Sequence, residues 1–249
     1  MCKLILKKWE KLPEEFQTEE VKRYYDILSK KKGSLFLKRI FDVTVSLIML
    51  VILLPVFIIL GIAIKIDSKG PVFFRQERIT QYGRTFRIFK FRTMVNNAEK
   101  LGTQVTVGND SRITKVGSFI RNCRLDEISQ LLNILAGDMT FVGTRPEVKK
   151  YVNHYTKEMM GTLLLPAGVT SLASIYYKDE AELLEKSDNP DKTYIEEILP
   201  EKMKYNLQSI EKFNFLEDIK IMFMTIFAVL GKKCNDDYEV IKEKEEIEI

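Results

Sequence analysis

The feature that most constrains the fold is a long apolar run, VTVSLIMLVILLPVFIILGIAIKI, which occupies residues 43–66 and carries no charge before Lys65. As a straight helix this run is roughly 35 Å long, which is enough to cross the hydrocarbon core of a bilayer. A cleavable signal peptide does not fit, because the run starts too far into the chain and no small-residue cleavage site follows it. The run therefore predicts a helix that associates with a membrane.

The centre and the flanks of this run leave three arrangements open. Pro55 removes a helical hydrogen bond at the middle of the run, which predicts a kink or a break. Basic residues precede the run at Lys38 and Arg39 and follow it at Lys65 and Lys69, so both ends prefer the cytoplasm under the positive-inside rule. A re-entrant helix that breaks and returns to the same face, and a single-pass anchor, are equally favoured. A buried core helix ranks third, because so long a run is apolar all round.

Composition limits the remaining possibilities. The chain has 249 residues, of which 45% are hydrophobic, so it can form one domain, or one domain with appendages. A formal net charge of only +4 disfavours a nucleic-acid binder that depends on bulk charge. Three widely separated cysteines give neither a disulfide framework nor a zinc knuckle, and a single histidine rules out a His-rich metal site.

The rest of the chain predicts a mostly helical α+β domain. Two strands are expected at 72–74 and 85–91, joined through Tyr82-Gly83 as a hairpin. In the second strand RTFRIFKFR alternates aromatic and basic residues, a pattern that a half-buried strand with a solvated basic face explains without any binding role. A helix is expected where leucine and isoleucine recur at helical spacing over 128–135, and Gly137 ends it.

A second apolar stretch, residues 219–230, is too short to span a bilayer. It fits a helix that lies in the membrane interface, and nearly as well a core helix, and Gly231 is expected to stop it. The expected organisation then has five parts. They are an amphipathic extension (1–34), the membrane helix (35–66), a catalytic domain (67–215), an interfacial amphipathic helix (216–233) and an acidic tail (234–249).

Side chains suited to chemistry gather between Asn109 and Pro146. Asp126 and Glu127 stand at the start of the expected helix and point about 100° apart, so one can attack a substrate while the other holds a metal. Carboxylates beside several arginines, without histidine, suit phosphate chemistry assisted by Mg²⁺. Taken singly, the pair is more simply explained as first-turn acids that complement the helix dipole, with surface arginines nearby.

Several ordered motifs, taken together, resemble the bacterial sugar transferases, the monotopic phosphoglycosyl transferases that begin glycan assembly on a polyprenol phosphate. The similarity extends from about Phe36 to Leu230. The motifs that carry it are Lys38-Arg39-x-x-Asp42, Gly70-Pro71-Val72-Phe73-Phe74-Arg75-Gln76, Phe89-Lys90-Phe91-Arg92-Thr93-Met94, Arg112-Ile113-Thr114-Lys115-Val116-Gly117, Leu125-Asp126-Glu127 with Gln130-Leu131, Gly137-Asp138-Met139, and Arg145-Pro146.

The resemblance implies a re-entrant helix broken near Pro55, a monotopic location on the cytoplasmic face of the bacterial inner membrane, and a two-step reaction. Asp126 would attack the β-phosphate of a UDP-sugar and release UMP, and polyprenol (undecaprenyl) phosphate would then take the phosphosugar from the aspartate. It implies that Glu127 binds Mg²⁺. The residues expected to bind substrate are Lys90, Arg92, Arg112, Arg121, Asp138 and Arg145.

A different class of protein stays open as an alternative. A membrane-anchored module without catalytic activity would use the basic strand and the arginines to bind anionic lipid or a protein partner. Nucleic-acid binding through the same strand is disfavoured by the low net charge and by the membrane segment. A homodimer is compatible with the sequence but no pattern in it requires one.

Overall fold

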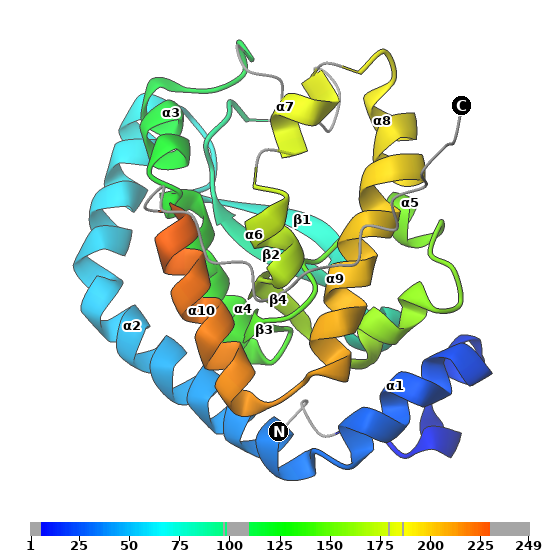
Figure 1. Ribbon diagram of the computed structural model, residues 1–249. Helices are drawn as coiled ribbons and strands as arrows, with labels where there is room; N and C mark the ends of the chain where they lie inside the picture. Colours follow the sequence, from blue (N-terminus) through cyan, green and yellow to red (C-terminus); the bar gives the residue numbers. More distant parts are fainter. Residues whose placement is uncertain (1–5, 97, 99–109, 179, 186, 230–249) are drawn as a thin grey trace.

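The computed structural model describes residues 6–96, 98, 110–178, 180–185 and 187–229, and it confirms a mostly helical α+β fold (Figure 1). The predicted acidic tail and the stop at Gly231 lie outside the described residues. The α-helices are α1 (Glu19–Ser29), α2 (Lys32–Asp67), α3 (Lys115–Asn122), α4 (Leu131–Ala136), α5 (Lys149–Val152), α6 (Leu172–Tyr176), α7 (Glu180–Glu185), α8 (Pro190–Thr193), α9 (Leu199–Glu211) and α10 (Phe215–Val229). The strands are β1 (Phe73–Ile79), β2 (Thr85–Phe91), β3 (Met139–Val142) and β4 (Ala167–Thr170).

The apolar run lies within α2, which continues through Pro55 without interruption. The prediction that the helix breaks at Pro55 is therefore wrong, because α2 does not end there. A proline removes one hydrogen bond and clashes with the turn before it, and a bend relieves that clash while the helix continues. Figure 1 shows α2 curving along one side of the domain, with its first turns beside α10 and its last turns beside α3.

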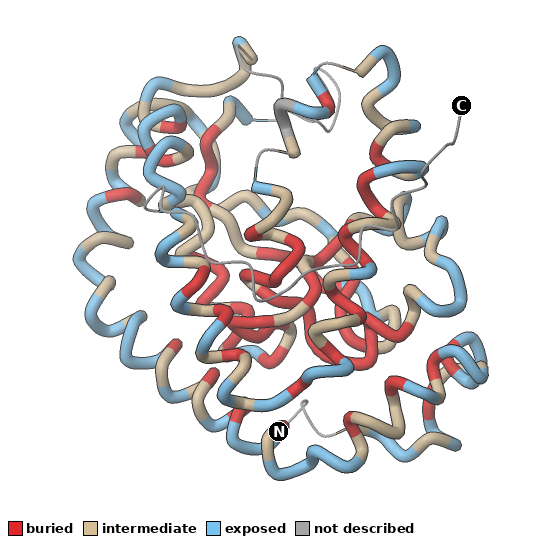
Figure 2. Tube along the Cα trace, in the orientation of Figure 1, coloured by how far each residue is buried: buried red, intermediate tan, exposed pale blue. Residues whose placement is uncertain are grey.

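The middle of α2 is not covered by the rest of the protein. Val51, Ile52 and Ile59 each keep about two thirds of their surface exposed (67%, 69% and 65%). By length and composition α2 is the one described helix that could cross a membrane. A core helix of a soluble protein would bury such side chains, so the third arrangement considered above does not fit. Figure 2 shows the contrast between this exposed outer edge and the buried centre of the domain.

The first turns of α2 are fastened to the domain by a buried ion pair. Lys38 was expected to be a basic flank of the membrane run, but its ammonium is buried and lies 2.5 Å from an Asp218 carboxylate oxygen on α10. The same Nζ donates to the backbone carbonyl of Val142 at 2.7 Å. Lys38 therefore joins α2 to both α10 and β3.

Two further residues of the same motif complete this attachment. Arg39, also expected as a basic flank, is buried and donates to the carbonyl of Ile134 at 2.8 Å, near the C-terminal end of α4. Asp42 accepts from the Thr140 hydroxyl at 2.6 Å and from the Phe141 amide at 3.2 Å. Cations suit the negative end of a helix dipole, so Arg39 also stabilises α4. The motif thus fastens the first turns of α2 to the domain.

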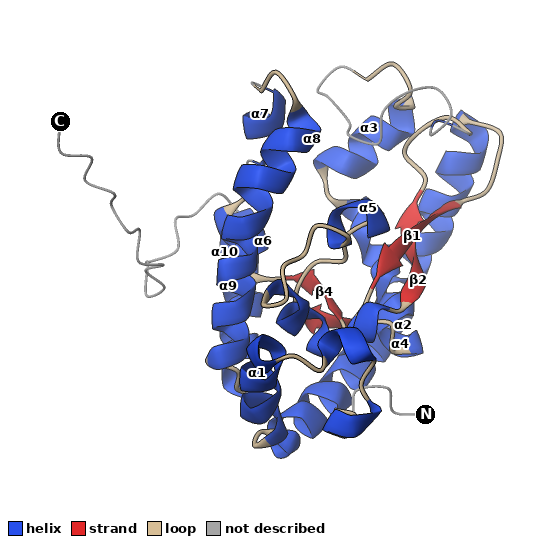
Figure 3. Ribbon diagram, turned by 90° about the vertical axis from the view of Figure 1, so that its right-hand side faces the viewer, coloured by secondary structure: helices blue, strands red, loops and turns tan. Residues whose placement is uncertain are grey.

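The predicted hairpin is confirmed and is longer than expected. β1 and β2 pair antiparallel from Phe73 opposite Phe91 to Ile79 opposite Thr85. The turn between them is a short 3₁₀ helix, Gln81–Gly83, in which Gly83 adopts a positive φ of 70°. The hairpin lies on the side of the domain opposite α9 (Figure 3).

A second, smaller sheet was not predicted. β3 and β4 pair in parallel at the centre of the buried core, with Met139 opposite Ala167. The strands approach closely: a Cβ on Gly168 would lie 2.1 Å from the carbonyl oxygen of Gly143. Four residues in each strand are too few for an alternating pattern to reveal them.

The two ends of the described chain pack differently from one another. Phe16, just before α1, and Leu28, within it, are fully buried, and the hydroxyl of Thr18 caps the start of α1 at 3.4 Å. In α10 one face is buried at Ile221, whereas Leu216 on another face is 70% exposed. The helix therefore has both a core face and an uncovered apolar face.

Candidate active site

The Asp126–Glu127 pair stands on a 3₁₀ helix, Leu125–Gln130, that precedes α4. Arg124 enters this helix with a left-handed φ of 53°, an uncommon conformation for a residue with a Cβ. The helix predicted over 128–135 is therefore α-helical only in its second half, which ends as expected at Gly137 (φ 77°). The sharp turn at Arg124 presents both acids to β2.

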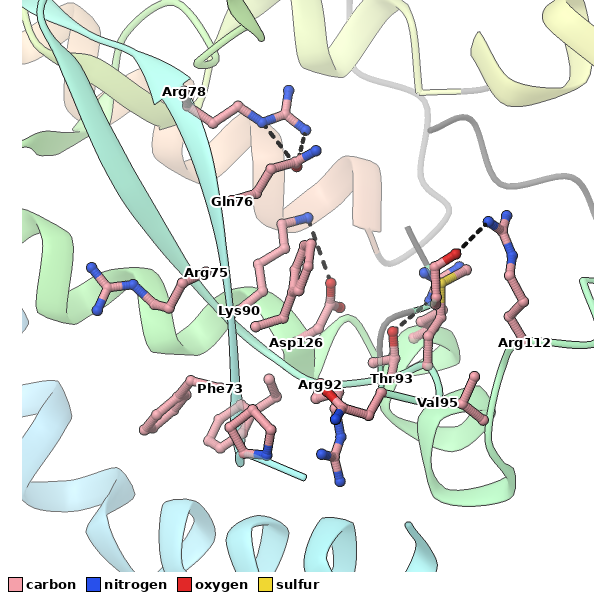
Figure 4. A pocket seen from close by; sticks show the side chains of 17 residues that line it. Phe73, Arg75, Gln76, Arg78, Lys90, Arg92, Thr93, Val95, Arg112 and Asp126 are labelled. Atoms are coloured by element: carbon pink, nitrogen blue, oxygen red, sulfur yellow. Dashed lines mark hydrogen bonds and ion pairs between the residues drawn. The ribbon is translucent and has the colours of Figure 1, made fainter. Parts of the chain in front are cut away.

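Lys90 of β2 lies between the two carboxylates. Its Nζ is 3.7 Å from an Asp126 oxygen and 3.3 Å from a Glu127 oxygen, and Figure 4 shows its side chain directed at Asp126. Adjacent residues were expected to face different ways, yet both reach the same ammonium because it sits between them. This is the first of the expected site residues that the fold brings together.

Arg145 approaches Glu127 from the segment after β3, with Nη2 2.6 Å from Oε1. Glu127 is therefore held between two cations. Burial by itself would raise the pKa of Glu127, but Arg145 and Lys90 outweigh it and hold that pKa at about 2. Glu127 is consequently ionised throughout the neutral range.

Asp126 has the opposite shift. Burial raises the pKa of Asp126 above its usual value, the neighbouring Glu127 charge adds to the rise, and Lys90 opposes it. Two adjacent carboxyl groups whose pKa values are pushed apart are typical of catalytic pairs with different roles.

A cavity of about 510 Å³ opens beside Asp126 (Figure 4). A volume of this order suits a small-molecule ligand. The basic residues that line it are Arg75, Arg78, Lys90, Arg92, Arg112 and Arg121. Five arginines and a lysine around one carboxylate give the cavity a strongly cationic wall, which suits a phosphorylated ligand.

Two of the expected arginines lie in this wall with their side chains already partnered. Arg121 donates from Nε to the Thr93 hydroxyl at 2.8 Å. Arg112 forms an ion pair with Asp110 at 2.5 Å and lies toward the other end of the wall in Figure 4. Glu127 and Arg145 are not among the residues that line the cavity; Glu127 lies beside Asp126 and shares Lys90 with it.

Arg92 and Asp138 are placed differently from the expectation. Arg92 borders the cavity, but its guanidinium donates to the carbonyls of Ser68 at 2.6 Å and Lys69 at 3.2 Å, where α2 ends. It therefore caps the C-terminal end of α2 rather than pointing at a ligand. Asp138 is not among the cavity residues and pairs with Arg84 at 2.9 Å beside the hairpin turn.

Residues of β1 were missed as site candidates. Arg75, Gln76 and Arg78 line the cavity, because β1 continues to Ile79 whereas the sequence predicted a strand only over 72–74. Residues 73–79 read FFRQERI, in which four polar residues follow one another between the phenylalanines and Ile79. The segment therefore lacks the alternating pattern that would have revealed the rest of the strand.

The described residues could bind Mg²⁺ only together with a phosphorylated substrate. Among them, no group of three or more His, Cys, Asp or Glu side chains gathers into a potential ligand set. Mg²⁺ is commonly held by one or two carboxylates together with substrate phosphates and water. An ionised Glu127 beside Asp126 can supply such a carboxylate, whereas a site made from protein ligands alone does not fit these residues.

Comparison with known proteins agrees with these observations. A UDP-N-acetylgalactosamine-undecaprenyl-phosphate N-acetylgalactosaminephosphotransferase of Aeromonas hydrophila is 33% identical over 198 residues, covering 78% of this chain and 44% of the relative. A UDP-glucose:undecaprenyl-phosphate glucose-1-phosphate transferase of Escherichia coli K12 is 35% identical over 203 residues, covering 80% and 41%. An undecaprenyl-phosphate galactose phosphotransferase of Salmonella typhimurium is 30% identical over 217 residues, covering 81% and 42%.

The chain spans less than half the length of each of these three relatives. The family model described as bacterial sugar transferase matches residues 33–232, which include α2 except its first residue, both sheets, the acidic pair and α10. The similarity therefore covers the whole of the candidate site and its attachment to α2. This chain belongs to the bacterial sugar transferase family.

Proposed function

We propose that this protein transfers a sugar phosphate from a UDP-sugar to polyprenol phosphate, with Asp126 as the attacking group. The observation that carries the proposal is the split acidic pair: a partly buried Asp126 that opens onto a cationic cavity, and an ionised Glu127 held by Lys90 and Arg145. The names of the relatives support the same reaction class.

The reaction proceeds in two displacements at one phosphorus atom. An Asp126 carboxylate oxygen bonds to the β-phosphorus of the UDP-sugar, and the bond from that phosphorus to the bridging oxygen breaks, so UMP leaves with that oxygen. A phosphate oxygen of polyprenol phosphate then bonds to the same phosphorus and the aspartyl bond breaks. The carboxylate is restored and polyprenyl-diphospho-sugar is formed, so no other reactant is needed.

Each neighbour of Asp126 has a role in this scheme. Lys90 stabilises the ionised form of Asp126 before attack and can contact the departing phosphate afterwards. Arg121 lines the cavity on the same side and suits phosphate oxygens. Glu127 would hold Mg²⁺, which neutralises diphosphate charge when bound. Arg145 keeps the Glu127 carboxylate in place.

We also propose that α2 is a re-entrant anchor on the cytoplasmic face of the membrane. The support is the curve of α2 in Figure 1, the uncovered apolar side chains around Pro55, and the attachment of both its ends to the same domain. Leu216 and Phe223 on α10 (70% and 58% exposed) would lie in the interface beside it. A lipid phosphate would then reach the cavity from the headgroup layer.

The non-catalytic alternative is less well supported by the geometry. It needs the basic strand to face lipid or a partner, but Lys90 is turned toward Asp126 and Glu127. It predicts that Asp126→Asn leaves function intact, whereas the transferase loses activity.

The test is UMP release by the purified chain in nanodiscs with Mg²⁺, undecaprenyl phosphate and a panel of UDP-sugars that includes glucose, galactose and N-acetylgalactosamine. The expected result is turnover with at least one donor, which Asp126→Asn reduces by about 10³-fold or more, as for other covalent nucleophiles. Asp26→Asn is the control, because Asp26 lies on α1, is paired with Lys22 and does not line the cavity. Turnover that survives in Asp126→Asn would reject the proposed role.

A further inference from the structure

A second cluster of ionisable side chains lies outside the cavity and is almost completely buried. Glu147, Tyr194 and Lys202 keep only 8%, 4% and 9% of their surfaces exposed. The Tyr194 hydroxyl donates to Glu147 Oε1 at 2.5 Å, and Lys202 Nζ donates to the Tyr194 oxygen at 3.0 Å. Lys202 also pairs with Glu180 of α7 at 2.8 Å. Burying charges in this way is costly, and it requires each group to be partnered.

This cluster is joined by the chain to the candidate active site. Glu147 stands two residues after Arg145, the partner of Glu127. The carbonyl of Glu147 accepts from the Ile79 amide at 2.9 Å, and the carbonyl of Pro146 accepts from Arg78 at 3.2 Å. The backbone after Arg145 is therefore held on the β1 side by two hydrogen bonds, and the Glu147 side chain holds it on the other side.

Tyr194 is placed for this contact by an unusual element. It begins a five-residue π-helix, Tyr194–Ile198, between α8 and α9. Such wide turns are rare and often occur at functional sites. The Tyr194 ring packs against Tyr151, with ring centroids 4.5 Å apart, so both its ring and its hydroxyl are fixed. Burial and the nearby Glu147 charge raise the pKa of Tyr194, which therefore stays protonated and donates.

We propose that Tyr194 and Lys202 are positioning residues for Arg145. By fixing Glu147 they hold the backbone that follows Arg145, and so they set how Arg145 meets Glu127 beside Asp126. The effect expected on the rate of UMP release rests on the proposed function. The effect expected on the backbone of residues 143–149 rests on geometry alone. Without the Tyr194 hydroxyl, the buried Glu147 Oε1 loses its hydrogen-bond donor and keeps only the Lys202 ammonium, 3.7 Å away, so the carboxylate moves toward that lysine.

The experiment compares Tyr194→Phe with Tyr151→Phe. Both variants keep the ring and remove one hydroxyl that donates to a carboxylate; Tyr151 packs against Tyr194 but donates to Asp191 at 2.8 Å, outside the buried cluster. Of these two hydroxyls, only that of Tyr194 donates to Glu147. For UMP release, Tyr194→Phe is expected to lower kcat about tenfold with little change in KM, and Tyr151→Phe to change it less than about threefold.

A double-mutant cycle separates positioning from general damage to the fold. In an Arg145→Lys background, Tyr194→Phe is expected to lower kcat by less than about twofold more, because the contact that it supports is already changed. An equal loss in both backgrounds would overturn the proposal. Glu147→Gln, which can still accept from Tyr194, should retain more activity than Glu147→Ala, and the reverse order would also overturn it.

Amide hydrogen exchange gives a readout that does not depend on activity. Tyr194→Phe is expected to speed exchange in the peptide covering residues 143–149 by about tenfold, whereas Tyr151→Phe leaves it unchanged. Unchanged exchange in Tyr194→Phe would overturn the proposal even if wild-type protein is active. If Tyr194→Phe speeds exchange but the wild-type protein releases no UMP, the proposed function is rejected and the positioning contact is kept.

Discussion

Replacing Lys38 with methionine should destabilise the protein strongly, although the side chain was expected to be a simple basic flank. Lys38 and Asp218 keep only 3% and 10% of their side chains exposed, and Lys38 Nζ contacts both Asp218 and the Val142 carbonyl. In Lys38→Met the Asp218 carboxylate stays buried without its cation. Removing one partner of a buried ion pair costs about 3–5 kcal/mol. For a chain of this size that lowers the melting temperature by about 6–20 °C.

The assay is thermal unfolding in detergent micelles, with Lys65→Met as the matched control. Lys65 belongs to the same helix but its side chain is exposed, so its replacement should shift the midpoint by less than about 2 °C. The double variant Lys38→Met with Asp218→Leu leaves no unpaired charge and should regain at least half of the loss. The reasoning is refuted if Lys38→Met behaves like Lys65→Met, or if the double variant is no more stable than Lys38→Met.

Three further predictions follow from particular side chains. Because only ionised Asp126 attacks and burial raises its pKa, kcat/KM should fall as the pH drops through that pKa. Lys90→Met removes the charge that lowers the Asp126 pKa, so the acid limb of the pH profile should move to higher pH. An acid limb that stays in place would contradict this assignment. Gly70→Ala places a Cβ 2.0 Å from Arg92 Nη1 at a φ of +135°, so the free energy of unfolding should fall by about 2 kcal/mol. An unchanged thermal midpoint would exclude this strain. Ile52→Lys, at the 69% exposed middle of α2, should weaken vesicle binding about tenfold in flotation assays while unfolding in detergent is unchanged; equal binding would argue against membrane insertion there.

The sequence predicted those parts of the fold whose signals are local. Alternating residues in RTFRIFKFR predicted β2, and Gly137 correctly ended α4. The site candidates Asp126, Glu127, Lys90 and Arg145 were selected by residue type and resemblance, and the fold brings all four together.

Contacts between distant segments could not be predicted in this way. A lysine beside an apolar run is normally solvated, and Lys38 is buried only because Asp218, 180 residues later, meets it. Arg92 lies in a basic motif, but its role as a helix cap depends on where α2 ends. The Tyr194–Glu147 contact likewise needs a π-helix that no local pattern indicates.

The central claim is that Asp126 carries the phosphosugar between the two steps, and one measurement tests it most directly. Wild-type protein is mixed with its UDP-sugar and Mg²⁺ but no polyprenol phosphate, and UMP release and intact protein mass are followed together. The account predicts one burst of UMP, of at most one equivalent per protein, with a matching mass increase on Asp126 that polyprenol phosphate then removes and that Asp126→Asn never gains. UMP release that occurs only when polyprenol phosphate is present, with no mass increase, would contradict the account and indicate direct transfer.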